Sequence, residues 1–288
     1  MNVLSTKANS TVVKANFSPR NMDFAFTPAA LPRYYADNNP LLTAIMTTLS
    51  AAIPEGERFF VESVRHFRDR VSDPVLKKEI SAFIGQEAFH AREHDAFNRA
   101  LLQNGVSMER HERIFAIPIN LMRRMPQKFQ LAATAALEHY TAIIAEQLLR
   151  SPDMREKLAP ISRAFWEWHA LEETEHKAVA FDVYETVSGS YSLRAGTMLL
   201  ISAVYWPLVL SMSFKMVIDD GRIFNVREVL KGLNIALGRK GFFSTLAPKY
   251  LDYLKPGFHP NDHNTDALLA EWRERLFGSQ GLLAGNVK

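Results

Sequence analysis

Two Glu-x-x-His pairs have the clearest chemical potential in this sequence: Glu87–His90 and Glu173–His176. Residues three positions apart lie on the same face of a helix. A carboxylate and an imidazole placed in this way can bind one metal ion together. Short pairs of this kind also arise by chance, so their interpretation depends on the surrounding residues.

A glutamate on an otherwise apolar helical face precedes each pair by one predicted helix. Glu57 shares its face with Phe60 and Val64, and Glu138 shares its face with Ala135 and Ala142. An unpaired buried carboxylate is costly, and two divalent metal ions are the simplest way to stabilise four of them beside two imidazoles. The alternative is four separate salt-bridged or helix-end glutamates together with solvated histidines.

The order Glu, Glu-x-x-His, Glu, Glu-x-x-His is the pattern of di-iron and di-manganese carboxylate proteins with ferritin-like bundles. We therefore predict two bound iron ions, with manganese as the alternative. The expected metal ligands are Glu57, Glu87, His90, Glu138, Glu173 and His176, with Glu87 and Glu173 as the bridges.

Apolar residues recur at three- and four-residue spacing along most of the chain, which predicts helices rather than strands. The first helix opens at Asn38-Asn39-Pro40 and is restarted or kinked at Pro54, and Asp73 caps the second helix. The predicted long helices cover about residues 54–70, 74–104, 126–150 and 155–187, with a smaller one at 107–124. This layout predicts an all-α fold, a ferritin-like four-helix bundle with one long crossover and additional C-terminal helices.

We expect three parts: a flexible N-terminal arm over residues 1–30, the bundle over 31–190, and a helical extension over 191–288. The extension contains twenty consecutive uncharged residues, Ala195 to Phe214. Three interpretations remain open for this segment. It could pack on the bundle or in a homodimer, lie on a membrane surface, or span a membrane.

The composition narrows the classes of function. The 288 residues carry a formal net charge of only +3, and no basic stripe with interleaved aromatic residues is present, so we expect no nucleic-acid partner. The absence of cysteine excludes thiolate ligands and a cysteine nucleophile. We expect a cytoplasmic protein, peripheral to the inner membrane if the apolar segment contacts it.

Four segments, IPEGERFF, IGQEAFHAREH, ALEHYTA and WHALEETEHKAVAFDVY, resemble a bacterial family called predicted metal-dependent hydrolases. The resemblance covers about residues 30–270. The metal-ligand spacing is also similar to that of di-iron arylamine N-oxygenases of the p-aminobenzoate type, which carry His-x-x-x-Glu-x-x-His on the last bundle helix. His169, Glu173 and His176 match that motif. The resemblance implies that His169 is a seventh ligand; the alternative is a core histidine bonded to a carboxylate.

We expect further residues to support the ligands or line a substrate cavity: His94, Thr134, Thr141 and Asp182. Asp182 would orient a ligating imidazole, a role that Glu62 or Asp95 could also take. His139, Glu172 and Glu175 are predicted to point away from the ligands.

These expectations favour an O₂-activating di-iron enzyme that acts on an apolar or aromatic small molecule and receives electrons from an external donor. Two other functions remain open. One is a two-metal hydrolase, in which the ions lower the pKa of a bound water. The other is a protein that binds metal for storage or for structure.

Overall fold

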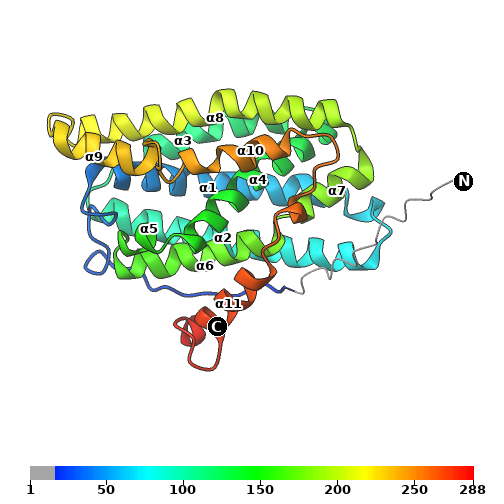
Figure 1. Ribbon diagram of the computed structural model, residues 1–288, viewed down its shortest axis with the longest axis horizontal. Helices are drawn as coiled ribbons and strands as arrows, with labels where there is room; N and C mark the ends of the chain where they lie inside the picture. Colours follow the sequence, from blue (N-terminus) through cyan, green and yellow to red (C-terminus); the bar gives the residue numbers. More distant parts are fainter. Residues whose placement is uncertain (1–16) are drawn as a thin grey trace, which may run out of the picture.

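The computed structural model describes residues 17–288, and this part of the chain is helical, as predicted (Figure 1). No strand forms within it; two isolated bridges join Met22 to Val287 and Ala36 to Leu158. The four-helix bundle consists of α1 (Pro40–Arg65), α2 (Pro74–Gln103), α4 (Gln127–Arg150) and α6 (Pro160–His176). Helix α3 (Glu109–Arg123) makes the crossover between α2 and α4.

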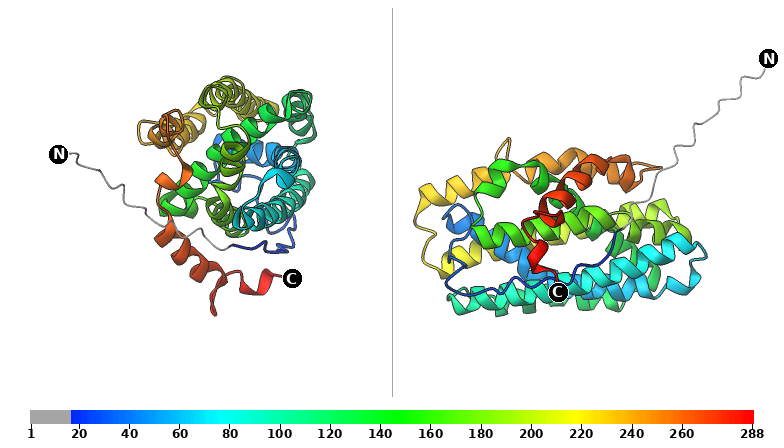
Figure 2. Two further views of the ribbon diagram at one scale, coloured as in Figure 1. Left: turned by 90° about the vertical axis from the view of Figure 1, so that its right-hand side faces the viewer. Right: turned by 90° about the horizontal axis from the view of Figure 1, so that it is seen from below.

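The remaining helices pack around this bundle. They are α5 (Pro152–Glu156), α7 (Val179–Val187), α8 (Tyr191–Asp219), α9 (Val226–Leu237), α10 (Ala247–Tyr253) and α11 (Asp266–Phe277). Short 3-10 turns lie at Arg68–Arg70, Ser244–Leu246, Pro260–Asp262 and Ala284–Asn286. Viewed along the bundle, α8 and α10 lie on one side and α11 with the C-terminus lies on the other (Figure 2).

Helix α1 begins at Pro40, at the predicted Asn38-Asn39-Pro40 opening, and continues through Pro54. The side chain of Asn39 accepts a hydrogen bond from the amide of Leu42 and thus caps the helix. Pro54 has no N–H to donate to the carbonyl of Ser50. The side chain of Asn98 in α2 donates to that carbonyl instead, at 3.2 Å. The prediction that a separate long helix restarts at 54 was wrong because this tertiary contact replaces the lost hydrogen bond.

The last bundle helix is divided, whereas a single helix over 155–187 was predicted. Pro160 takes the first position of α6, where its missing N–H costs nothing. Helix α6 ends at His176, and α7 starts at Val179. Between them Lys177 donates to Thr265 at 3.0 Å and to the carbonyl of His263, so the break follows a contact with the C-terminal region.

Residues 17–30 were predicted to belong to a flexible arm, but residues 17–24 lie against the bundle. Phe17, Met22 and Phe24 are buried, and Pro19 packs so closely on Gly85 that a Cβ there would lie 2.4 Å from the ring. The rest of the predicted arm, residues 1–16, lies outside the described residues. Burial of three large apolar side chains explains why residues 17–24 form an ordered strap across the bundle.

Helix α8 contains the uncharged segment and packs lengthwise on α1 and α4. Met198, Val209 and Met212 are buried on its inner face. Leu200 and Val204 are exposed on its outer face. Among the described residues, α8 is the one helix with enough length and apolar character to cross a membrane, and 33% of its apolar window is buried. One face is therefore used in packing and the other is left open.

Candidate metal centre

Helices α1, α2, α4 and α6 direct three histidines and four glutamates into the middle of the bundle. Each of these side chains is buried, with a relative exposure no higher than 5%. We call them the carboxylate–histidine cluster: Glu57, Glu87, His90, Glu138, His169, Glu173 and His176.

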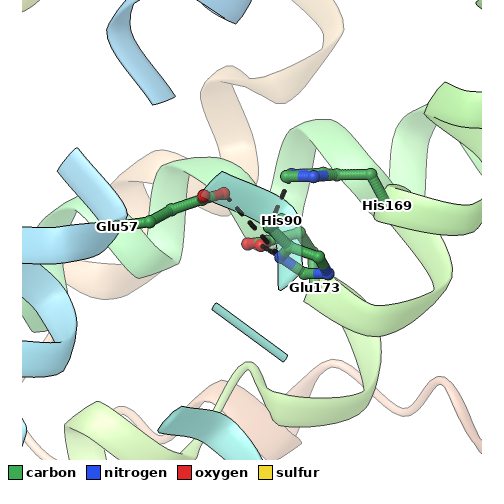
Figure 3. A group of neighbouring side chains, drawn as sticks. All are labelled: Glu57, His90, His169 and Glu173. Carbon is green, nitrogen blue, oxygen red and sulfur yellow. Dashed lines mark ion pairs between the residues drawn. The ribbon is translucent and has the colours of Figure 1, made fainter. Parts of the chain in front are cut away.

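One half of the cluster lies between α1, α2 and α6. Glu57, His90, His169 and Glu173 each offer a ligand atom, and these atoms lie within 4.8 Å of one another (Figure 3). His90 Nδ1 is 3.2 Å from Glu173 Oε1 and 3.7 Å from Glu57 Oε1. His169 Nε2 is 3.4 Å from the same oxygen of Glu173. This half can therefore hold one ion between two imidazoles and two carboxylates.

The other half lies between α2, α4 and α6. His176 Nε2 is 3.1 Å from Glu87 Oε1, 3.4 Å from Glu138 Oε2 and 3.5 Å from Glu173 Oε1. Ligand atoms of Glu87, Glu173 and His176 lie within 4.8 Å of one another. A second ion would have one imidazole and three carboxylates around it.

Glu87 and Glu173 lie between the two halves. Oε1 of Glu173 faces His90, His169 and His176. Oε1 of Glu87 is 3.8 Å from His90 Nδ1 and 3.1 Å from His176 Nε2. These two carboxylates thus have the position that bridging ligands require, whereas Glu57 and Glu138 each reach one half.

The donor atoms of the cluster are buried without hydrogen-bond partners among residues 17–288. They are Glu57 Oε2, both carboxylate oxygens of Glu87, His90 Nδ1, Glu138 Oε1, Glu173 Oε2 and His176 Nε2. Buried polar atoms are almost always paired in native proteins. A group of oxygens and imidazole nitrogens that face one another without pairing fits a pair of divalent cations.

Protonation of the metal-free cluster leads to the same conclusion. Burial, and then repulsion from Glu87, raise the pKa of Glu138 to about 8. Burial and the neighbouring carboxylates also raise the pKa of Glu57. Burial opposes a charge on His90, but its contacts with the carboxylates of Glu172 and Glu173 outweigh burial and raise its pKa to about 9. Without metal, protons must neutralise this pocket, and cations would replace them.

His169 has the opposite electrostatic environment. Burial, and then the charge of His90, lower the pKa of His169 to about 3. The ring is therefore neutral, which is the form of imidazole that binds metal.

Each of the three histidines uses its second ring nitrogen for a hydrogen bond outside the cluster. His90 Nε2 donates to Glu172 Oε2 at 3.1 Å, and His176 Nδ1 donates to Gln86 Oε1 at 3.0 Å. His169 Nδ1 lies 3.1 Å from His94 Nε2. Metal-binding histidines are usually fixed in this way, because the outer hydrogen bond selects the tautomer and orients the ring.

Sequence reasoning missed the outer partners Gln86, Glu172 and Glu175. Glu172 was set aside because it points away from the ligands on its own helix, yet His90 reaches it from α2. Gln86 donates to Glu175 at 3.0 Å while it accepts from His176. The available signal was their position: Gln86 and Glu172 each directly precede a predicted ligand.

The strap supplies a cation to this outer layer. Arg20 donates to Glu172 at 2.9 Å and to both oxygens of Glu175 at 2.8 Å. Arg273 also donates to Glu175, at 2.6 Å. Two buried carboxylates next to the cluster are thereby neutralised by arginines from opposite ends of the chain.

The other residues that we expected near the site lie in different places. His94 lies beside His169 as expected. Thr134 bonds to Ser63 at 2.6 Å, and Asp182 accepts a hydrogen bond from His259 at 2.8 Å. Because all three cluster histidines already have outer partners, Asp182 does not orient them, contrary to our expectation.

The expected substrate cavity is displaced from its predicted position. Of the two threonines that we expected beside it, Thr134 and Thr141, only Thr141 lines the apolar pocket between α1, α3, α4 and α8. Thr134 does not line this pocket because its side chain is fully buried inside the bundle.

Comparison with known proteins agrees with a metal site. Residues 18–264 match the model of a family described as predicted metal-dependent hydrolase. A match was found neither among curated proteins nor among solved structures. The family match covers most of the sequence and all seven residues of the cluster. The chain therefore belongs to the family of predicted metal-dependent hydrolases.

Proposed function

We propose that this protein is a di-iron oxidoreductase that activates O₂ and oxidises an apolar small molecule. The observation that carries the proposal is the carboxylate–histidine cluster itself, whose buried donor atoms face one another without hydrogen-bond partners among the described residues. The cluster is built on four helices of one bundle, as in the di-iron carboxylate proteins.

The donor set favours iron over zinc. Four carboxylates balance the charge of two divalent ions, and oxygen-rich sites with imidazole suit iron or manganese. Zinc sites more often have four ligands with tetrahedral geometry. The presence of His169 beside Glu173 and His176 is similar to the arylamine N-oxygenase motif and supports a redox role.

The protein residues have separable tasks in this proposal. Glu87 and Glu173 would hold both ions, and Glu57 and Glu138 would each hold one. Bound iron supplies electron transfer and reaction with O₂. Glu172, Gln86 and His94 keep the outer nitrogens of the three imidazoles occupied, so the inner nitrogens face the centre.

The proposed reaction has a defined balance. Insertion of one oxygen atom into a C–H or N–H bond consumes O₂, two electrons and two protons, and it releases one water. The two electrons come from an external donor, such as a reduced flavin or an iron–sulfur protein. The buried position of the cluster limits the access of bulk water to the oxidant.

Hydrolysis is the second candidate, and the family description favours it. Two metal ions can lower the pKa of a bound water and thereby supply the nucleophile. A non-enzymatic role in metal binding is the third. The three functions predict different outcomes when the iron form meets O₂ and when the zinc form meets a hydrolysable substrate.

The decisive experiment loads metal-free protein anaerobically with Fe(II) and then mixes it with O₂. We expect two iron ions per chain, a rapid change in absorbance, and O₂ consumption that continues only with a reductant. Glu173→Ala should abolish the reaction, and Glu185→Ala, on the exposed surface of α7, serves as the matched control. Zinc-dependent cleavage of ester, amide or phosphate substrates, without any reaction of the iron form with O₂, would establish the hydrolase instead.

A further inference from the structure

An apolar pocket of about 300 Å³ lies outside the cluster, between α1, α3, α4 and α8. No charged side chain lines it within the described part of the chain. The hydroxyl of Thr141 donates to the carbonyl of Glu138, and that of Tyr140 bonds to Ser202. These two hydroxyls have partners, Tyr205 adds the third lining hydroxyl, and all other lining side chains are apolar, so the pocket selects for mainly apolar material.

The pocket is elongated. Its lining on α4 runs from Phe129 to Ile144, fifteen positions apart, or about 22 Å along a helix. On α1 and α8 the lining runs over eight positions, Ala52 to Phe60 and Leu200 to Leu208, or about 12 Å. On α3 the lining runs from Phe115 to just beyond the end of the helix, at Met125. A groove of this length exceeds the size of a single aromatic ring and matches an extended chain.

The inner wall of the pocket adjoins the cluster. Gly56 and Leu137 line the pocket and directly precede the cluster residues Glu57 and Glu138. A ligand that reaches this wall would lie against the two helix segments that carry these carboxylates. The pocket is therefore placed to bring a substrate next to the proposed centre.

Gly56 keeps this wall open. It lies in the interior of α1, where glycine forms helix less readily than alanine. A Cβ at this position would meet only Phe60 Cζ, at 3.9 Å, which is an ordinary contact. Packing thus does not require glycine here, and what the missing side chain provides is space in the pocket.

The mouth of the pocket is apolar as well. Leu121 on α3 and Leu200 and Val204 on α8 line the pocket and are 63%, 55% and 47% exposed. Exposed apolar side chains that border an apolar cavity mark a binding surface rather than random surface residues. They give a hydrocarbon an entry route that avoids charged groups.

We infer that this pocket binds an unbranched hydrocarbon chain, the alkyl or acyl part of the substrate, and that any polar headgroup remains outside the mouth. The inference rests on the proposed function only where it names this hydrocarbon as the substrate of the metal centre. The hydrocarbon-binding site, which we call the chain site, is inferred from the pocket alone.

Fluorescence titration of the full-length protein with cis-parinaric acid, a fluorescent unbranched fatty acid, tests the inference. We expect saturable binding that palmitate displaces and that benzoate does not. Gly56→Leu should weaken binding at least tenfold because the new side chain fills the inner wall. Gly196→Leu is the matched control, because Gly196 lies on the exposed face of α8 with open space around it. Should Gly56→Leu fail to fold, Gly56→Ala should still weaken binding several-fold.

Metal content measured in the same preparations separates the two proposals. If the protein binds two iron ions per polypeptide but does not bind parinarate, the chain site is overturned and the proposed function remains intact. Displacement by benzoate but not by palmitate, or equal binding by Gly56→Leu and wild type, would also overturn it. Binding that Gly56→Leu abolishes, in protein that takes up no metal, would confirm the chain site and contradict the proposed function.

A second experiment asks whether the hydrocarbon ligand enters from water or from a membrane. Parinarate is presented either free in solution or within phosphatidylglycerol vesicles. Faster loading from vesicles, lost in Val204→Glu, identifies the bilayer as the source. Equal loading in both arms identifies the free acid. Both results support a chain site, and the absence of loading in either arm would contradict it.

Discussion

His90 and Glu172 are joined across two helices by a hydrogen bond of 3.1 Å, and both side chains are fully buried. The other nitrogen of His90 faces Glu173, the residue that follows Glu172 on α6. Two adjacent residues of one helix thus contact opposite sides of a single imidazole. Arg20 neutralises Glu172 from the outside, which allows this carboxylate to remain buried.

We predict that Glu172→Gln weakens metal binding about 10–100-fold, because loss of an outer carboxylate reduces the basicity and orientation of the ligating imidazole. Competition titration with a chelator measures this effect. Glu185→Gln provides the control on the exposed surface of α7. Glu172→Asp should restore part of the affinity; equal affinities of Glu172→Gln and wild type would show that the hydrogen bond has no role at the site.

The bridging and terminal carboxylates should differ when they are removed. Glu173→Ala is expected to lose both ions, because its carboxylate faces all three histidines of the cluster. Glu57→Ala should chiefly lose one ion, because its carboxylate faces His90. Elemental analysis after anaerobic loading with iron gives the stoichiometry directly. Retention of two ions by Glu173→Ala would contradict the bridging assignment.

The cluster was predictable because helical periodicity places its members on inner faces. Glu87 and His90, or Glu173 and His176, need only one local rule to lie side by side. Contacts between helices follow no such rule. The bond from His90 to Glu172 depends on the relative rotation of α2 and α6, which the sequence does not specify.

The errors in the helix boundaries also had tertiary causes. Pro54 was a valid local signal for a helix start, but Asn98 of α2 supplies the missing donor and α1 continues. Lys177 has no local feature that predicts a break, and its contacts with Thr265 and His263 come from residues far along the chain. Residues 17–24 looked polar enough for a mobile arm, but their three apolar side chains are buried on the bundle.

A pH-dependent contribution to stability is expected from Glu146 on α4. Burial opposes its charge, but hydrogen bonds from Lys249 of α10 and from Arg150 outweigh burial and lower its pKa. Its stabilisation is therefore fully present above the ordinary value of 4.5 and is lost as the pH falls through the lowered pKa. Glu146→Gln should lower the free energy of unfolding by about 1–2 kcal/mol at neutral pH.

Urea denaturation at several pH values measures this contribution. The difference between Glu146→Gln and wild type should shrink as the pH falls below 4.5. The exposed residue Glu156 provides the control variant Glu156→Gln. A difference that stays constant from neutral to acidic pH would show that the charge of Glu146 makes no contribution.

A chain of hydrogen bonds extends outward from His169 to the turn of α1 that precedes Pro54. His169 Nδ1 is bonded to His94 Nε2, and His94 Nδ1 lies 2.8 Å from Ser50 Oγ. The hydroxyl of Ser50 donates to Asn98 Oδ1 at 2.6 Å, and the amide of Asn98 donates to the carbonyl that Pro54 leaves free. One consistent assignment of protons runs from His169 to Ser50, and it leaves the lone pair of His169 Nε2 directed at Glu173 and the proposed ion.

This chain predicts different results for two substitutions of His94. His94→Phe keeps a ring but removes the acceptor for His169 Nδ1, so His169 loses its fixed tautomer and metal affinity should fall about tenfold. His94→Gln retains an acceptor oxygen and should recover most of that affinity, whereas a purely structural role would show no such recovery. His169→Ala should be at least as impaired as His94→Phe. Chelator competition on the iron-loaded variants measures the three affinities, and equal binding by His169→Ala and wild type would remove His169 from the set of ligands.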